Sequence, residues 1–348
     1  MKRRWLSWLQ RRWLLLLVTV AFIALLGLRF GEVSQIAVTL LHGQLQWVLV
    51  AVLSQVAYYS LYAILYQLGF FTVGVESRWE ELVPVMFASI FLKAVVPSGG
   101  VSSLAVMVDD AARRGQSSAR ATEGALLVLV ADLATMAPLL VYGLLYLARR
   151  DALQLYQAVA VLCFLGFAGG LAALLLLARW QPRALYSLLF GLQQAGNHVA
   201  SWLRRPPLLA ADWARKSAAE FAGAATGIAT HPRRLVRTLA LALVLHLLDV
   251  LALYAIFLAY HSPVGLGAVV VGFAMDVVFS VVTFIPHGLG VAESILTLAF
   301  VSLGVPSRKA LVVSLAFRGL NVWLPLAIGF LFLHQIRSFG ARRHAPQG

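Results

Sequence analysis

Six charged side chains lie within otherwise apolar stretches of this 348-residue sequence, and they are the first candidates for chemistry. They are Lys93, Asp132, Asp249, Asp276, Glu293 and Arg318. An ionised side chain inside a lipid bilayer costs roughly 2.5–3.5 kcal/mol on insertion scales, so it needs a partner or a water-filled path. Such residues therefore predict either a site for a polar ligand or a structural ion pair.

Two of the cations are candidate ligands of a phosphate group. Lys93 lies four residues before Pro97, and Arg318 lies in the last long apolar run. Ammonium and guanidinium groups bind phosphate, and free backbone N–H groups at helix ends add to that binding. We expect Lys93 and Arg318 to hold an anionic headgroup. Glu293, Asp132 or Asp276 would then compete for these cations or carry a coupling proton. The alternative is that these charges form ion pairs that hold broken helices together.

Helical spacing links the remaining polar residues. Arg318 and Asn321 lie three residues apart on one helix face, and we expect a buried ion pair between Arg318 and Asp132. Asp132 and Asn321 therefore join Lys93, Arg318 and Glu293 as candidate substrate-binding residues. A second group is a candidate proton relay, and its members are His246, Asp249, Asp276 and His287. The eight histidines and the single cysteine have no metal-site spacing, so we expect neither metal nor cofactor.

Composition shows that membrane helices must position these residues. Hydrophobic residues make up 61% of the chain and charged residues 12%, with a mean hydropathy of +0.85, values that exclude a soluble globular protein. About 20 apolar residues cross the hydrocarbon layer as a helix. Six runs meet this requirement, at about 13–30, 45–68, 122–148, 153–178, 235–260 and 309–334.

Basic residues predict the orientation of these helices. With both termini in the cytoplasm, 21 of the 28 lysines and arginines fall on the cytoplasmic side and 5 outside, which leaves Lys93 and Arg318 within the membrane. Cytoplasmic loops are enriched in lysine and arginine. The net charge of +14 therefore reports topology rather than a nucleic-acid partner. We expect a multi-pass membrane protein with both termini in the cytoplasm.

Two further apolar stretches, 82–108 and 264–304, are broken near their middles by proline and glycine. The residues at the breaks are Pro97, Gly99, Gly100, Pro286, Gly288 and Gly290. Each stretch predicts a pair of broken or re-entrant helices, and whether each pair crosses the membrane twice or dips and returns stays open.

The two breaks superpose without gaps when the chain is slid along itself until Pro97 falls on Pro286. The other matched pairs in this register are Gly99 with Gly288, Gly115 with Gly304, Ala121 with Ala310, and Asp132 with Asn321. Because three spans separate the two breaks, the two halves of the repeat enter the membrane from opposite faces. The sequence predicts an inverted repeat, with halves at about 82–148 and 264–334 and a substrate site near the membrane midplane. All of 1–348 forms one membrane domain.

Residues 179–234 form the one sizeable hydrophilic stretch. Trp180, Trp202 and Trp213 stand beside arginine or lysine there, which suits helices in the lipid headgroup layer. The alternative is that these charges only determine topology. No nucleophile elbow, phosphate-binding loop or metalloprotease motif occurs in the sequence, so we do not expect an enzyme.

The two broken motifs resemble a known family. The run from Leu92 to Ser102, followed by Arg113-Arg114-Gly115, is similar to the first hallmark of the flippase-like membrane domain of lysylphosphatidylglycerol synthases, the UPF0104 family. The run from Ile285 to Glu293, with the following Leu303-Gly304-Val305-Pro306 and Ala316-Phe317-Arg318, resembles its second hallmark. The resemblance covers about residues 10–335.

This resemblance implies a multi-pass protein of the bacterial cytoplasmic membrane that moves or handles a lipid, either an anionic phospholipid or a lipid of polyprenyl or hopanoid type. The sequence shows no aminoacyl-transferase domain after the membrane part, so we do not expect lysylphosphatidylglycerol synthesis. Two alternatives stay open. One is a membrane-embedded transferase that acts on a lipid, and the other is a scaffold for a separate lipid-modifying synthase.

Overall fold

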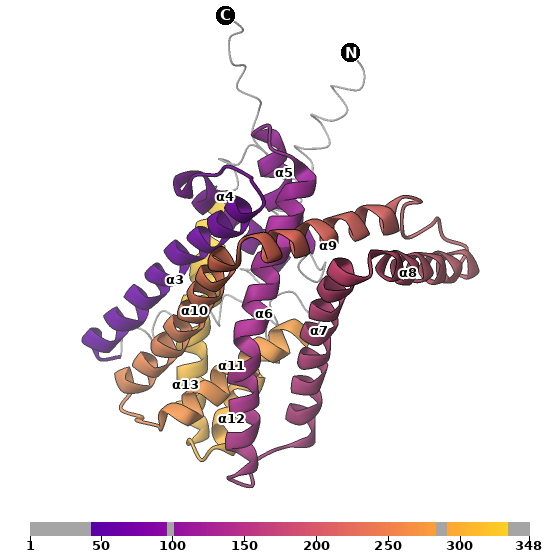
Figure 1. The fold of residues 1–348 in the computed structure, drawn as a ribbon. Helices are drawn as coiled ribbons and strands as arrows, with labels where there is room; N and C mark the ends of the chain where they lie inside the picture. Colours follow the sequence, from indigo (N-terminus) through magenta and orange to yellow (C-terminus); the bar gives the residue numbers. More distant parts are fainter. Residues whose placement is uncertain (1–42, 96–100, 283–290, 333–348) are drawn as a thin grey trace, which may run out of the picture.

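A computed structural model describes residues 43–95, 101–282 and 291–332, and the regular elements within these ranges are all helices (Figure 1). The prediction of an all-α protein is confirmed. Long apolar runs with few charges favour helices in a bilayer, because a helix satisfies its backbone hydrogen bonds within one segment.

Five helices are long and apolar enough to span a membrane. They are α3 (Leu45–Thr72), α6 (Ser118–Ala148), α7 (Leu155–Trp180), α10 (Pro232–Ala259) and the continuous segment Ser307–Phe332. They coincide with five of the six predicted runs, while the run at 13–30 lies outside the described residues. The chain is a multi-pass membrane protein.

Helices α3 and α10 pack antiparallel against each other. At one end the backbone N–H of Gln44 donates to the carbonyl of Ala259 at 3.0 Å. At the other end Arg234 Nη1 donates to the carbonyl of Phe71 at 3.0 Å. Helix α6 packs against both and approaches α3 closely at Gly69, where a Cβ atom would lie 2.8 Å from the Gly124 carbonyl oxygen.

Each broken stretch forms two helices, as predicted. The first gives α4 (Trp79–Val95) and α5 (Val101–Arg113), and the second gives α11 (Leu266–Val282) and α12 (Val291–Ser302). The proline and glycine residues of both breaks lie outside the described residues. Within the described residues, α5 comprises 13 residues and α12 comprises 12.

Matching helix ends follow the repeat register in which Pro97 falls on Pro286. Helix α5 is followed by Gly115 at φ 84°, and α12 by Gly304 at φ 86°. Both ends carry the same backbone hydrogen bond, from Gln116 to the Ala111 carbonyl and from Val305 to the Phe300 carbonyl, each 3.0 Å long. A left-handed residue at this position favours glycine. The repeat register therefore aligns structure as well as sequence.

The two halves also run in opposite directions. Glu123 near the start of α6 and Arg234 near the start of α10 line one pocket, so these helices begin at the same end of the bundle. Lys309 near the start of the last span donates to the His261 carbonyl, just beyond the end of α10, at 3.0 Å. The described helices thus run in the inverted sense that the repeat predicts.

Each half packs its broken pair against the long span of the other half. Helix α11 packs on α6, and α4 packs on α14 (Leu324–Phe332). Phe87 and Phe91 of α4 face Phe332 and Phe330 of α14, with ring centroids 6.0 and 5.8 Å apart. The broken pairs of both halves are thereby brought into one bundle.

The last span is not one uniform α-helix, which the sequence did not predict. Helix α13 (Ser307–Arg318) passes into a π-helical turn, η2 (Gly319–Trp323), before α14 begins. Such turns widen a helix locally and occur often at functional sites. This turn starts directly after Arg318 and includes Asn321.

Helices α8 (Pro182–Trp202) and α9 (Trp213–Thr230) leave the bundle sideways (Figure 1). They fill the hydrophilic stretch for which helices were predicted. Proline occupies the first turn of both α8 and α10, where its missing N–H is not needed.

Candidate functional site

Polar side chains from several helices meet around α10. His246 and Asp249 lie one turn apart on this helix, and both are at least nine-tenths buried. They face α6 on one side and α3 and the π-helical turn on the other. The sequence predicted them as partners in a proton relay, and the structure places them at the centre of a larger polar cluster.

His246 contacts Asp132 of α6. Its Nε2 atom lies 3.2 Å from the main-chain carbonyl oxygen of Asp132 and 3.6 Å from the carboxylate Oδ1. The first distance allows a hydrogen bond when Nε2 carries the proton, while the second is too long for one. The Asp132 side chain is 41% exposed and is therefore accessible from outside the packed core.

Asp249 contacts the second half of the repeat. Its Oδ1 atom accepts hydrogen bonds from Gln55 Nε2 at 2.8 Å and from Asn321 Nδ2 at 3.4 Å. The hydroxyl of Tyr59, one turn beyond Gln55 on α3, donates to the Asn321 carbonyl at 2.8 Å. These bonds fix the π-helical turn against α3 and α10.

The contacts of α10 follow the repeat symmetry. Asp132 and Asn321 are equivalent in the repeat register, and they contact His246 and Asp249, which are one helical turn apart. The polar cluster therefore lies between the two halves. Sites between inverted repeats are where transporters bind their substrates.

Arg318 pairs with a different carboxylate from the one expected. Its Nη1 atom donates to Asp276 Oδ1 of α11 at 3.3 Å, and both side chains are less than a tenth exposed. The prediction of an Asp132–Arg318 pair was wrong, because Asp132 turns toward His246 while α11 brings Asp276 to Arg318. Spacing along single helices could not show which neighbour each carboxylate would face.

Lys93 occupies the last turn of α4 and is exposed, in contrast to Arg318. The carboxylate of Asp132 is exposed as well. Lys93 and Asp132 thus form the accessible part of the cluster, and Arg318 and Asp276 its buried part. His287 lies outside the described residues, as does the side chain of Glu293.

Gln55 and Tyr59 belong to the cluster although sequence reasoning did not select them. Both are neutral, and a neutral side chain stands out less in an apolar run than a charged one. The available signal was the concentration of polar atoms in Ser54-Gln55 and Tyr58-Tyr59, within a span that is otherwise apolar. A buried amide needs hydrogen-bond partners, so Gln55 by itself indicated a polar neighbour.

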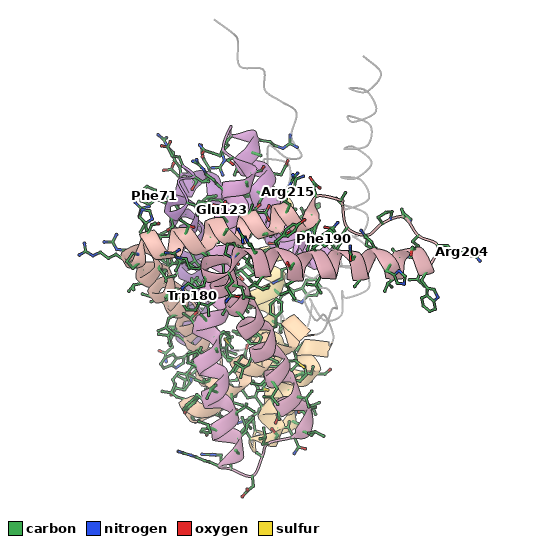
Figure 2. All side chains as sticks on the ribbon, turned by 45° about the vertical axis from the view of Figure 1, so that its right-hand side comes forward. Phe71, Glu123, Trp180, Phe190, Arg204 and Arg215 are labelled. Carbon is green, nitrogen blue, oxygen red and sulfur yellow. The ribbon has the colours of Figure 1, made fainter. Side chains whose placement is uncertain are left out.

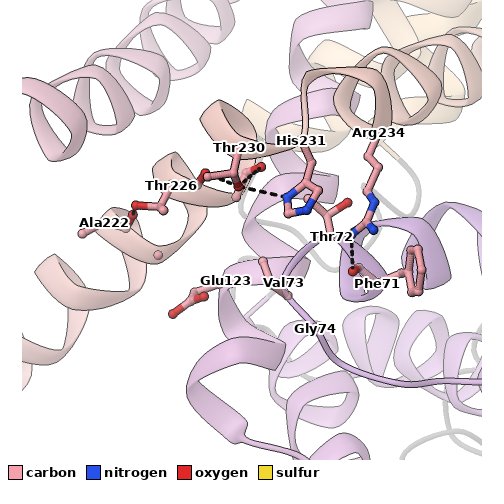
Figure 3. A pocket seen from close by; sticks show the side chains of 12 residues that line it. Phe71, Thr72, Val73, Gly74, Glu123, Ala222, Thr226, Thr230, His231 and Arg234 are labelled. Carbon is pink, nitrogen blue, oxygen red and sulfur yellow. Dashed lines mark hydrogen bonds between the residues drawn. The ribbon is translucent and has the colours of Figure 1, made fainter.

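A pocket of about 610 Å³ lies away from this cluster, where α9 passes the ends of α3, α6 and α10 (Figure 3). Arg234 points into it, but its guanidinium already binds the Phe71 carbonyl and stacks 4.3 Å from the Phe71 ring. Thr226 and Thr230 bond to their own helix. The hydrogen-bond donors of Arg234, Thr226 and Thr230 are thus already bonded to other groups of the protein. Within the described ranges, no three histidine, cysteine or acidic residues are placed to hold a metal ion.

Comparison with known proteins identifies the family. Residues 12–329 match the family described as the lysylphosphatidylglycerol synthase TM region. The chain belongs to this family. A UPF0104 membrane protein of Pyrococcus horikoshii is 20% identical over 337 residues, covering 94% of this chain and 98% of that protein.

Membership in the lysylphosphatidylglycerol synthase TM region family confirms the resemblance seen in the two broken motifs. The match extends from before the first described helix into α14, so it includes both halves of the repeat. Together with the apolar spans, it indicates a lipid-related function in a membrane.

Proposed function

We propose that this chain is a flippase or lipid-handling transporter of the bacterial cytoplasmic membrane and that it has no catalytic activity of its own. Its cargo is a lipid with an anionic, phosphate-containing headgroup. The observation that supports this proposal is the polar cluster between the two inverted halves, which combines an accessible cation with a buried ion pair. A polar headgroup crossing a bilayer requires such a hydrated, charged path.

Lys93 makes the first contact with the headgroup in this mechanism. Its side chain is exposed at the end of α4, and the Asp132 carboxylate of α6 is exposed as well. An incoming phosphate becomes the counter-ion of Lys93. The negative charge of Asp132 also weakens phosphate binding, which allows the lipid to leave again.

Arg318 and Asn321 complete the path in the second half. Arg318 is held by Asp276 in the described conformation, so a phosphate reaches it only when that pair opens. When phosphate replaces Asp276 as the partner of Arg318, the lipid has different contacts in the two conformations. A ligand shifts the equilibrium between two conformations only when it binds them with different affinity. His246 and Asp249, with Asp276, His287 and Glu293, are the groups proposed to couple this exchange to protons.

Lipid translocation in reconstituted liposomes tests the proposal. Fluorescent phosphatidylglycerol in the inner leaflet is protected from an external quencher until the protein moves it outward. We expect Lys93→Gln to slow this exposure by about tenfold or more, equivalent to about 1.4 kcal/mol. Lys309→Gln, at an exposed lysine near the start of α13, is the matched control and should translocate at the parent rate.

An unchanged rate for Lys93→Gln would contradict the proposed site. Mass spectrometry of the lipids after the same incubation separates transport from catalysis, because a covalently altered lipid would support a transferase instead. A scaffold for a synthase predicts no translocation by the parent protein and co-purification of the synthase with both variants.

A further inference from the structure

Helices α8 and α9 form an arm that both neighbouring spans hold at the edge of the membrane. One residue, Gln181, separates the end of α7 from the start of α8, and one residue, His231, separates α9 from α10. Figure 2 shows the arm extending sideways, crosswise to the long spans, with Trp180 where α7 ends. Because α7 and α10 are candidate membrane spans, both ends of the arm lie at a membrane surface.

The arm is a fixed hairpin. Asn197 of α8 exchanges two hydrogen bonds with the backbone of Leu209 in the connecting turn, at 2.9 and 3.0 Å. The buried side chain of Gln193 accepts from the Ala214 N–H at 3.0 Å and donates to the Ala211 carbonyl at 3.3 Å. Leu185 and Leu189 of α8 pack against α9 in a shared core. One orientation of α8 relative to α9 is therefore set.

This orientation leaves an apolar stripe of α8 exposed. Its residues recur at alternating spacings of four and three, which places them on one helix face. They are Leu188, Leu192, Ala195, Val199 and Trp202. Trp202 is 80% exposed and Leu192 53%, and neither belongs to the apolar core between α8 and α9. Another face of α8 carries exposed polar side chains, including Gln194 and His198.

Charge indicates what covers this stripe. The arm carries the basic residues Arg183, Arg204, Arg205, Arg215 and Lys216, against the acidic residues Asp212 and Glu220, and Arg179 lies just before it at the end of α7. Lys216 pairs with Asp212 at 2.6 Å, and this hydrogen bond holds the pKa of the Asp212 carboxyl below its usual range. Arginines beside an exposed tryptophan-containing apolar face match an anionic lipid surface, which offers both acyl chains and negative headgroups.

We propose that the α8–α9 arm rests on the anionic lipid leaflet at the basic side of the bundle. The stripe from Leu188 to Trp202 enters the boundary between headgroups and acyl chains. The exposed Arg204 and Arg205 in the turn bind lipid phosphates at the far end of the arm, where Figure 2 shows Arg204. Helix α9 covers the membrane-facing helices α6 and α7 with its apolar side and presents Arg215 and Lys216 outward.

Spin labels on the full-length protein in nanodiscs test this placement. Cys163→Ser removes the single native cysteine, and Leu192→Cys or Gln194→Cys then carries a nitroxide. Both positions are exposed and only two residues apart, so they form a matched pair on different faces of α8. With phosphatidylglycerol in the bilayer, we expect the label at 192 to be more accessible to oxygen, which dissolves in lipid, than to a water-soluble nickel chelate. The label at 194 should be more accessible to the chelate than to oxygen.

Removal of charge in the turn tests the role of anionic lipid. Arg204→Gln with Arg205→Gln deletes two contacts worth about 1 kcal/mol each, which shifts the balance between docked and undocked arm about thirtyfold. The label at 192 should then become accessible to the chelate. A bilayer of phosphatidylcholine alone should have a similar effect on the parent arm.

Two results would overturn the proposal. Equal chelate accessibility at 192 and 194 in the anionic bilayer would show an arm in water. Shielding of the label at 192 from both oxygen and chelate would show that protein, such as a second copy or a partner synthase, covers the stripe. The translocation assay is a separate readout, so failure of the lipid-transport proposal leaves this test unaffected.

Discussion

The two halves of the repeat share a register but hold their charged groups differently. Both halves end their short helix at a left-handed glycine and begin the following helix three residues later, at Ser118 and Ser307. In the first half α6 is continuous, and Asp132 is 41% exposed. In the second half the span is interrupted by a π-helical turn, and Arg318 is 2% exposed. One architecture thus supplies an accessible charged surface and a buried ion pair.

The two halves therefore share their backbone turns but carry different side chains at equivalent positions. Equivalent positions carry an accessible carboxylate in one half and a hydrogen-bonded amide in the other, and α10 serves both through His246 and Asp249. Two halves with the same backbone fold suit a path between them that opens toward either side of the membrane. Asymmetric charges allow the headgroup to be attracted in one half and exchanged in the other.

The largest expected effect comes from breaking the buried pair of the second half. Arg318→Ala leaves Asp276 without the guanidinium that neutralises it, and removal of one partner from a buried pair costs about 3–5 kcal/mol. Denaturant titration of the purified protein in detergent should show this loss in the free energy of unfolding. Lys309→Ala removes an exposed cation from the same helix and should change stability by less than about 1 kcal/mol. Parent-like stability of Arg318→Ala would mean that the second half is not locked by this pair.

Exchange of the equivalent polar residues between the halves gives a smaller and asymmetric effect. Asn321→Asp puts a second carboxylate where an amide now donates to Asp249, and we expect a loss of about 2–3 kcal/mol because one carboxyl must take up a proton or repel the other. Asp132→Asn removes an accessible charge while the backbone carbonyl near His246 remains, so stability should change by less than about 0.5 kcal/mol. Thermal unfolding of both variants provides the comparison, and equal losses would contradict the asymmetry.

The smallest effect tests the feature that the halves share. Gly115→Ala and Gly304→Ala each force a side chain into the left-handed region, at a cost of about 1 kcal/mol. No neighbouring atom lies within 4 Å of the position that either new methyl group would take, so conformational strain alone should act, and equally in both halves. Gly166→Ala, inside α7 with equally open surroundings, is the control and should stabilise by about 0.5 kcal/mol. A difference between Gly115→Ala and Gly304→Ala would break the structural equivalence of the two turns.

Sequence patterns determined the elements of this fold because the bilayer leaves few choices. Apolar length located five spans within a few residues, and Pro97 and Pro286 indicated where two stretches would each give two helices. The repeat register identified the turns at Gly115 and Gly304 that the structure shares. Backbone groups in lipid must bond within their own helix, so a span or a break is readable from one segment alone.

The partners of the charged residues were decided by the tertiary structure. Lys93, Asp132 and Arg318 were found from their unusual place in apolar runs, but the pairing of Arg318 with Asp276 depends on where the fold places α11 relative to α13. Gln55 reached Asp249 across 194 positions of sequence, and the π-helical turn that presents Asn321 had no signal in the apolar pattern. Hydrophobic periodicity is a property of one helix, whereas an ion pair or a buried hydrogen bond depends on the rotation and depth of two helices relative to each other.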